Sequence, residues 1–90
     1  MRTELVEIYS DATNAAILRH PERRFPGVLL QGDTLHEMLR KATRIKEVAA
    51  NLLPENEQYE LADLHEHLVE LVGHYKRTLA DHHLPLPFAE

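Results

Sequence analysis

The feature that most constrains the fold of this chain is a helix start signal in its middle, Thr34-Leu35-His36-Glu37. The tetrapeptide matches the capping box, in which the Thr side chain accepts a hydrogen bond from the amide three residues later and the Glu reaches back to the Thr amide. Apolar residues follow the signal at helical spacing, whereas short β-type runs precede it. The chain is therefore predicted to consist of strands followed by helices.

Three short runs of strand-forming residues precede this signal. Residues 5–9 alternate between apolar and polar side chains, and residues 15–19 are mostly apolar after a turn rich in Ser, Asp and Asn. These two runs predict a β-hairpin. A polar loop with two prolines leads to residues 28–31, which predict a third strand ending at Gly32. Together the runs predict one three-stranded antiparallel sheet.

Two amphipathic helices are predicted after the sheet. The first ends at Pro54 and has apolar residues at Leu35, Met38, Leu39, Ala42, Ile45, Ala49, Leu52 and Leu53. The second, residues 58–83, has an apolar stripe of Leu61, Leu64, Leu68, Leu71, Val72, Tyr75 and Leu79. Ninety residues are too few for two cores, so we expect a single α+β domain, residues 1–90, with the order β-β-β-α-α.

The C-terminal residues 84–90 are predicted to form an extended tail that docks on the protein. Prolines 85 and 87 prevent a helix, while Leu84, Leu86 and Phe88 place an apolar side chain at every second position. Apolar residues at this spacing favour burial in a groove or along a sheet edge. We therefore expect all three of these side chains to be buried.

Composition favours a small protein that associates with another chain. Hydrophobic residues make up 43% of the sequence, but there is no Trp and there are only two Phe, so the core must consist mainly of Leu, Val, Ile and Ala. Association would bury apolar surface that so modest a core leaves exposed. A homo-oligomer or a complex with a partner protein is expected.

Charge and cysteine content argue against several classes of function. The net charge of −5 argues against direct nucleic-acid binding, which needs a basic face. With no cysteine there is neither a thiolate zinc site nor a thiol nucleophile, which fits a reducing compartment. No apolar run resembles a signal peptide or a membrane span. We therefore expect a cytoplasmic protein that does not enter a membrane.

The stretch Phe25-Pro26-Gly27-Val28-Leu29-Leu30-Gln31-Gly32-Asp33-Thr34 resembles the signature of the HicB antitoxin family, a Pro-Gly turn and a short strand before Gly-Asp-Thr and a helix. The resemblance extends over residues 5–46, and Leu84-Pro85-Leu86-Pro87 is similar to the closing Ile-Pro-x-Pro segment of that family. The whole chain is also similar to a small uncharacterised bacterial family. The HicB resemblance implies a partial RNase-H-like fold without nuclease carboxylates, which sequesters a toxin and oligomerises.

A basic loop is the first candidate site. Arg19, His20, Arg23 and Arg24 lie next to Phe25, and such a cluster could bind a phosphate or an acidic partner through charge-assisted hydrogen bonds. In the alternative interpretation the loop is a solvated turn, and its arginines pair with acidic residues of the chain itself. The loop is still the best candidate for a partner-binding surface.

A metal site is the second candidate. His67, Glu70 and His74 share one face of the second helix at spacings of three and four, which suits a divalent cation with imidazole and carboxylate ligands. The same positions lie opposite the apolar stripe, where solvated polar residues are expected in any helix. The pattern is therefore also explained by a solvent-exposed face.

No group of residues in the sequence indicates catalysis. There is no Gly-rich phosphate loop, no nucleophile elbow and no His-Glu-x-x-His motif, and no cofactor is expected. The sequence therefore predicts a non-catalytic protein-binding module of the antitoxin or immunity type, which sequesters a basic partner protein such as a toxin. Two alternatives stay open: a small metal-binding protein or enzyme, and a homo-oligomeric structural protein.

Overall fold

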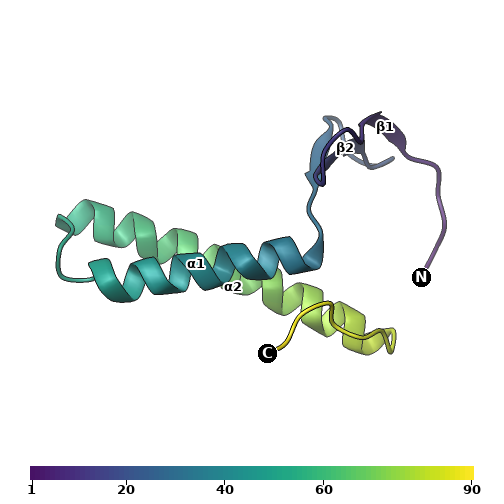
Figure 1. Cartoon of the computed structure of the whole chain (residues 1–90). Coiled ribbons are helices and arrows are strands. Elements are labelled where there is room, and N and C mark those ends of the chain that lie inside the picture. Colours follow the sequence, from purple (N-terminus) through teal and green to yellow (C-terminus); the bar gives the residue numbers. More distant parts are fainter. The chain divides into compact units, whose positions relative to one another are not determined.

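The order of the secondary structure is β-β-β-α-α, as the computed structural model of residues 1–90 shows (Figure 1). The elements are β1 (Glu7–Ser10), β2 (Ala16–Arg19), β3 (Gly27–Leu29), α1 (Gly32–Ala49) and α2 (Glu55–Asp81). The predicted α+β class is thus confirmed. The chain has two compact units, Met1–Gln31 with the strands and Gly32–Glu90 with the helices. The single cooperative domain expected from the chain length stays a prediction.

The sheet of the first unit is antiparallel with the strand order β1-β2-β3. Ile8 pairs with Leu18, and Ile17 pairs with Val28, while the register shifts between Ile8 and Ser10. Because β2 is the central strand, its residues are half-buried, whereas the residues of β1 and β3 are exposed. The sheet therefore has no buried core of its own.

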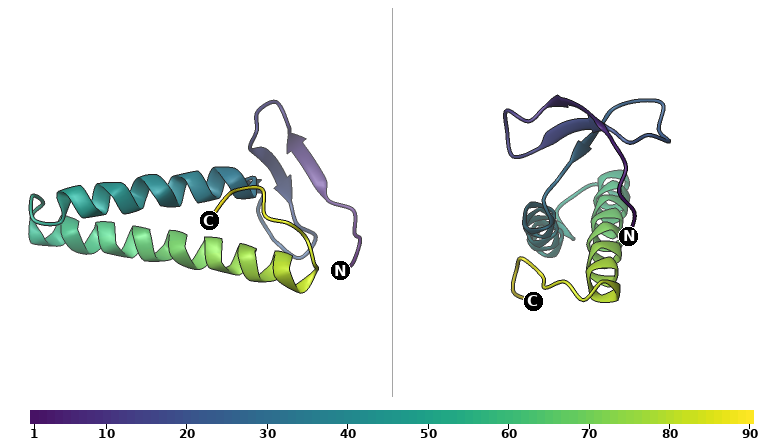
Figure 2. Two further views of the ribbon diagram at one scale, coloured as in Figure 1. Left: turned by 60° about the horizontal axis from the view of Figure 1, so that its bottom comes forward. Right: turned by 90° about the vertical axis from the view of Figure 1, so that its right-hand side faces the viewer.

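The second unit is a hairpin of two helices. Figures 1 and 2 show α1 and α2 side by side, joined by a short loop. Ala42 of α1 and Leu68 and Val72 of α2 are the buried hydrophobic residues of the chain. A hydrogen bond of 2.8 Å between Thr43 Oγ1 and His65 Nε2 fixes the antiparallel register of the two helices.

The start of α1 differs from the prediction. The helix begins at Gly32, two residues before the predicted cap, and Asp33 Oδ1 accepts a hydrogen bond of 2.9 Å from the Thr34 amide. The Glu37 carboxylate accepts from the Arg40 guanidinium and not from the Thr34 amide. The predicted capping box is therefore wrong, because an earlier start places Thr34 inside the first turn and Glu37 one turn from an arginine.

Both ends of α2 have a backbone explanation. The carbonyl of Pro54 accepts from the Gln58 amide at 3.0 Å, so the helix begins at Glu55, three residues before the predicted start. At the other end the amides of His83 and Leu84 donate to the carbonyls of Ala80 and Leu79. With His83 at a φ of 57°, these bonds form a Schellman motif, which ends the helix at Asp81.

The C-terminal tail docks on the helices through its last aromatic ring. Figure 2 shows the tail, coloured yellow, turning back from the end of α2. The Phe88 ring is stacked on His36 at a centroid distance of 4.0 Å and lies 6.3 Å from the ring of Tyr75. Phe88 and Leu86 are half-buried, but Leu84 is 56% exposed. The predicted burial of Leu84 is wrong because this residue closes the Schellman turn before the tail reaches the helices.

Candidate partner-binding surfaces

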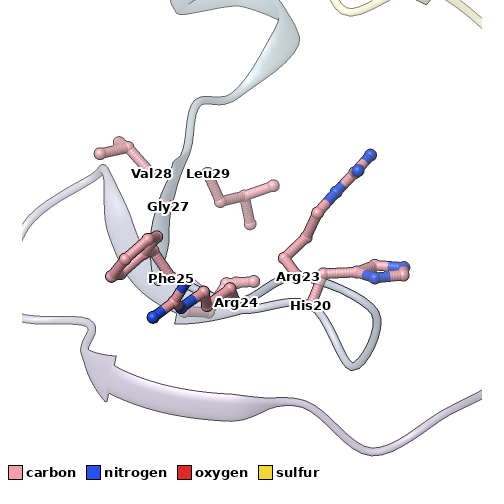
Figure 3. Close-up of a pocket in the computed structure, with 8 residues that line it drawn as sticks. His20, Arg23, Arg24, Phe25, Gly27, Val28 and Leu29 are labelled. Carbon is pink, nitrogen blue, oxygen red and sulfur yellow. The ribbon is translucent and has the colours of Figure 1, made fainter.

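The basic loop borders an open pocket on the sheet unit, between β2 and β3 (Figure 3). The loop turns sharply after β2, where the Arg23 amide donates to the His20 carbonyl at 2.9 Å. The pocket has a volume of about 480 Å³ and is lined by Leu18, His20, Arg23, Arg24, Phe25, Gly27, Val28 and Leu29. Four of the five residues predicted to bind a partner thus line one depression.

The pocket combines an apolar floor with cationic groups at its rim. Figure 3 shows Phe25 and Arg24 together on one side of Leu29, with Arg23 and His20 extending on the other side. The Arg24 guanidinium carbon lies 5.3 Å from the centroid of the Phe25 ring, in a cation–π contact. Neither Arg23 nor Arg24 forms a salt bridge within the chain. This chemistry suits a segment that carries both a carboxylate and an apolar side chain.

Arg19, the fifth predicted residue, has a different place in the structure. Its Nε donates to Glu7 Oε1 on the neighbouring strand at 2.5 Å, and its Nη1 donates to the Arg23 carbonyl at 2.8 Å. The hydrogen bond and the charge of Glu7 raise the pKa of Arg19 above its ordinary value. Arg19 therefore joins β1 to β2 and holds the loop, whereas the other four residues face the pocket.

A second candidate surface is the acidic face of α2. The helix carries seven acidic residues and two basic ones. Its own net charge of −5 is therefore the same as the net charge of the whole chain. None of the seven carboxylates takes part in a salt bridge, although Glu37 and Glu7 elsewhere in the chain do. Glu66 and Glu70 are exposed and lie opposite the buried Leu68 on the helix. These unpaired carboxylates make the exposed surface of α2 anionic.

The candidate metal ligands are not brought together by the structure. His67, Glu70 and His74 are all exposed on α2, and no group of three or more His, Cys, Asp or Glu side chains is arranged to hold a metal ion. The spacing of the three residues places them along one helix face, but no second element adds a ligand there. The arrangement matches the solvated face considered as the alternative.

A third surface was not distinguished from the core by the sequence. Met38, Ile45 and Leu64 belong to the predicted apolar stripes, yet they are 42%, 56% and 55% exposed. Together with Leu61, Leu68 and other neighbours they line a groove of about 300 Å³ that runs over both helices. The sequence does contain one sign of this surface. The apolar stripe of each helix is wider than the area that a single neighbouring helix can cover.

Neither α1 nor α2 offers an apolar stretch long enough to cross a lipid bilayer. No curated protein and no solved structure has a significant match to the chain.

The model of a family described as a family of unknown function (DUF6959) matches residues 1–88. This match confirms the similarity to an uncharacterised family, but it does not show the HicB family. Since this match covers nearly the whole sequence, the chain belongs to DUF6959.

Proposed function

We propose that this protein is a non-catalytic protein-binding module of the antitoxin or immunity type, which sequesters a basic partner protein in the cytoplasm. The observation that carries the proposal is that none of the seven α2 carboxylates has an ion-pair partner within the chain. An anionic surface of this kind steers a basic partner into encounter and fixes its orientation. Antitoxins and immunity proteins that cover the nucleic-acid-binding surface of a toxin work in this way.

The resemblance of residues 25–37 to the HicB signature supports the same class of function. The strand, the Gly-Asp pair and the helix of that signature occur in the structure as β3, Gly32-Asp33 and α1. The exposed apolar side chains of both units supply further surface that a complex would bury. The carboxylates of α2 would thus attract and orient the partner, and the exposed apolar side chains would contribute to the affinity of the complex.

The test is co-expression with the product of the neighbouring gene in the native host, followed by purification of the complex. We expect a stoichiometric basic partner whose binding weakens at high salt and falls about tenfold or more when Glu66→Gln and Glu70→Gln are combined. The matched control is Glu4→Gln with Asp11→Asn, which removes two exposed carboxylates from the other unit and leaves the basic loop unchanged. Binding that is unaffected by both pairs of substitutions would contradict the role of α2.

The pocket beside the basic loop is the second contact that we propose for the partner. Its apolar floor and the unpaired Arg23 and Arg24 suit an acidic segment. Replacing both arginines by Ala is expected to weaken the complex, while Arg2→Ala, which removes an arginine already paired with Glu4 and Glu22, leaves it unchanged. Equal affinities for the two variants would remove the pocket from the interface.

A further inference from the structure

The helical hairpin has a second apolar seam besides the one between its own helices. Ala42, Leu68 and Val72 fill the seam between α1 and α2. Met38 and Ile45 on α1, and Leu64 and Leu71 on α2, are each seven residues apart and stay between 42% and 56% exposed. A pair of helices needs only one seam, whereas a helix in a four-helix bundle has two.

The second seam lies on one side of the hairpin and spans both helices. Residues 38, 41, 42 and 45 of α1 and residues 61, 64 and 68 of α2 line the same groove of about 300 Å³. Lys41 is the one charged residue in its lining. The groove is therefore a continuous apolar surface of the kind that a second helical hairpin can cover.

The charges beside the groove favour a particular occupant. Lys41 borders the groove on α1, and Arg44 lies next to it on the outer side of that helix. Glu60 lies beside Leu64 on α2, and Asp63 lies farther round the same helix, on the face that also carries Glu70. None of these four exposed side chains forms a salt bridge within the chain. One flank of the groove is thus cationic and the other anionic, so the surface is complementary to a second copy of itself.

The register of the hairpin determines which orientation brings opposite charges together. The Thr43–His65 hydrogen bond sets residues 41 and 44 level with residues 67 and 64 of the antiparallel helix. A twofold axis along the helices places α1 of one copy over α2 of the other at the same level. Arg44 then lies about one turn or less from Glu60 and Asp63, and Lys41 about one turn from Asp63. The other orientation, with α1 over α1, would instead bring like charges together.

We propose that two copies of the chain associate through this groove to form a four-helix bundle in which α1 of each copy lies against α2 of the other. Glu66 and Glu70, the residues substituted in the test of the partner, are not among the charges used in this contact. Different substitutions therefore test the homodimer and the partner, and each proposal can fail without the other.

The first experiment is sedimentation velocity of the full-length protein from about 1 to 200 µM. We expect a reversible dimer that Ile45→Lys converts to a monomer while the far-ultraviolet circular dichroism stays helical, because Ile45 is more than half exposed. The matched control is Tyr59→Lys, a similarly exposed aromatic residue of α2 that is absent from the groove lining, and it should stay dimeric. A monomer throughout this range, or a dimer insensitive to Ile45→Lys, would overturn the proposal.

The second experiment tests the orientation. Lys41→Glu with Arg44→Glu should weaken the dimer about tenfold by placing acids opposite acids, and adding Glu60→Lys with Asp63→Lys should restore the affinity. If α1 lay over α1, the first pair of substitutions would exchange one like-charge contact for another and leave the affinity unchanged. That result would refute the proposed arrangement.

Discussion

At Gly32, the first residue of α1, the fold leaves no room for a side chain. A Cβ at this position would overlap the ring of Tyr75 at its Cζ, Oη and Cε1 atoms. Gly32→Ala must therefore displace that ring, which also lies beside Phe88. We expect a loss of about 1 kcal/mol or more in unfolding free energy, or roughly 4–8 °C in Tm, measured by circular dichroism.

Gly27→Ala is the matched control for this prediction. A Cβ at Gly27 has nothing within 4 Å, and the residue has no positive φ. The Tm of the Gly27→Ala variant should stay the same or rise slightly, because Ala restricts the unfolded chain more than Gly does. Equal Tm values for the two variants would show that Tyr75 moves aside without cost.

His83 holds a left-handed backbone conformation that a glycine adopts more easily. Its φ of 57° closes the Schellman motif after α2, and it is the only non-glycine residue of the chain with a positive φ. His83→Gly is expected to stabilise the protein by about 0.5 kcal/mol, seen as a Tm higher by roughly 2–4 °C. His82→Gly, at a φ of −100°, should give no gain. A lower Tm for His83→Gly would mean that the imidazole makes a stabilising interaction of its own.

The Glu37–Arg40 pair predicts a dependence of stability on pH. The hydrogen bond from Arg40, together with the charges of Arg40, Lys41 and His36, lowers the pKa of Glu37 below its ordinary value of 4.5. A carboxyl with a depressed pKa contributes stability that is present above pH 4.5 and is lost as the pH falls through the folded-state pKa. Arg40→Gln should therefore raise the pKa of Glu37 in an NMR titration and reduce this pH dependence. Arg44→Gln is the control, and equal titration curves for the two variants would exclude the pairing.

At the scale of elements, the tail is held to the helices by one ring. Phe88 stacks on His36 and approaches Tyr75, so Phe88→Ala removes contacts to both helices. We expect a loss of about 1–2 kcal/mol in unfolding free energy, with Leu84→Ala, an exposed residue of the same segment, as the control. A double-mutant cycle with His36→Ala should show coupling between positions 36 and 88. Additive effects would mean that the stack contributes nothing.

Local periodicity predicted the kind and order of the elements, but not how their ends are capped. Alternation in residues 5–9 and the 3.6-residue spacing after Gly32 are properties of single segments, so the sequence displays them directly. The caps depend on competition among neighbouring polar groups. Asp33 accepts from the Thr34 amide, which was predicted to donate to Glu37, and the Glu37 carboxylate accepts from Arg40 instead. Which group forms each hydrogen bond depends on the positions of neighbouring side chains in the folded helix, and a sequence motif does not specify these positions.

The candidate surfaces were predictable where their residues are contiguous in sequence. His20, Arg23, Arg24 and Phe25 lie on one loop, and all four line the same pocket. The role of Arg19 depends on Glu7, twelve residues away, which only the strand register brings into contact. The second apolar seam was hidden for another reason: inner and outer seams have the same period, so Met38 and Ala42 look alike in sequence.

At the scale of the whole molecule, stability is unevenly divided between the two units. All three buried hydrophobic residues, Ala42, Leu68 and Val72, belong to the helical unit. The sheet unit has strands of three or four residues, with every residue of β1 and β3 exposed, and the chain has no cysteine to cross-link them. Sheets this small are at best marginally stable in isolation.

This division leads to a prediction for the separated units. Residues 32–90 should retain a helical circular dichroism spectrum, because the buried residues, the Thr43–His65 bond and the Phe88 stack all lie within them. Residues 1–31 alone should be unfolded, since chains shorter than about 40 residues need a disulfide, a metal or a partner to fold. This prediction is tested by measuring circular dichroism and amide chemical shifts for each fragment and comparing them with those of the full chain. A cooperative thermal transition of residues 1–31 would show that the Glu7–Arg19 bridge and the cross-strand pairs stabilise the sheet without any other surface.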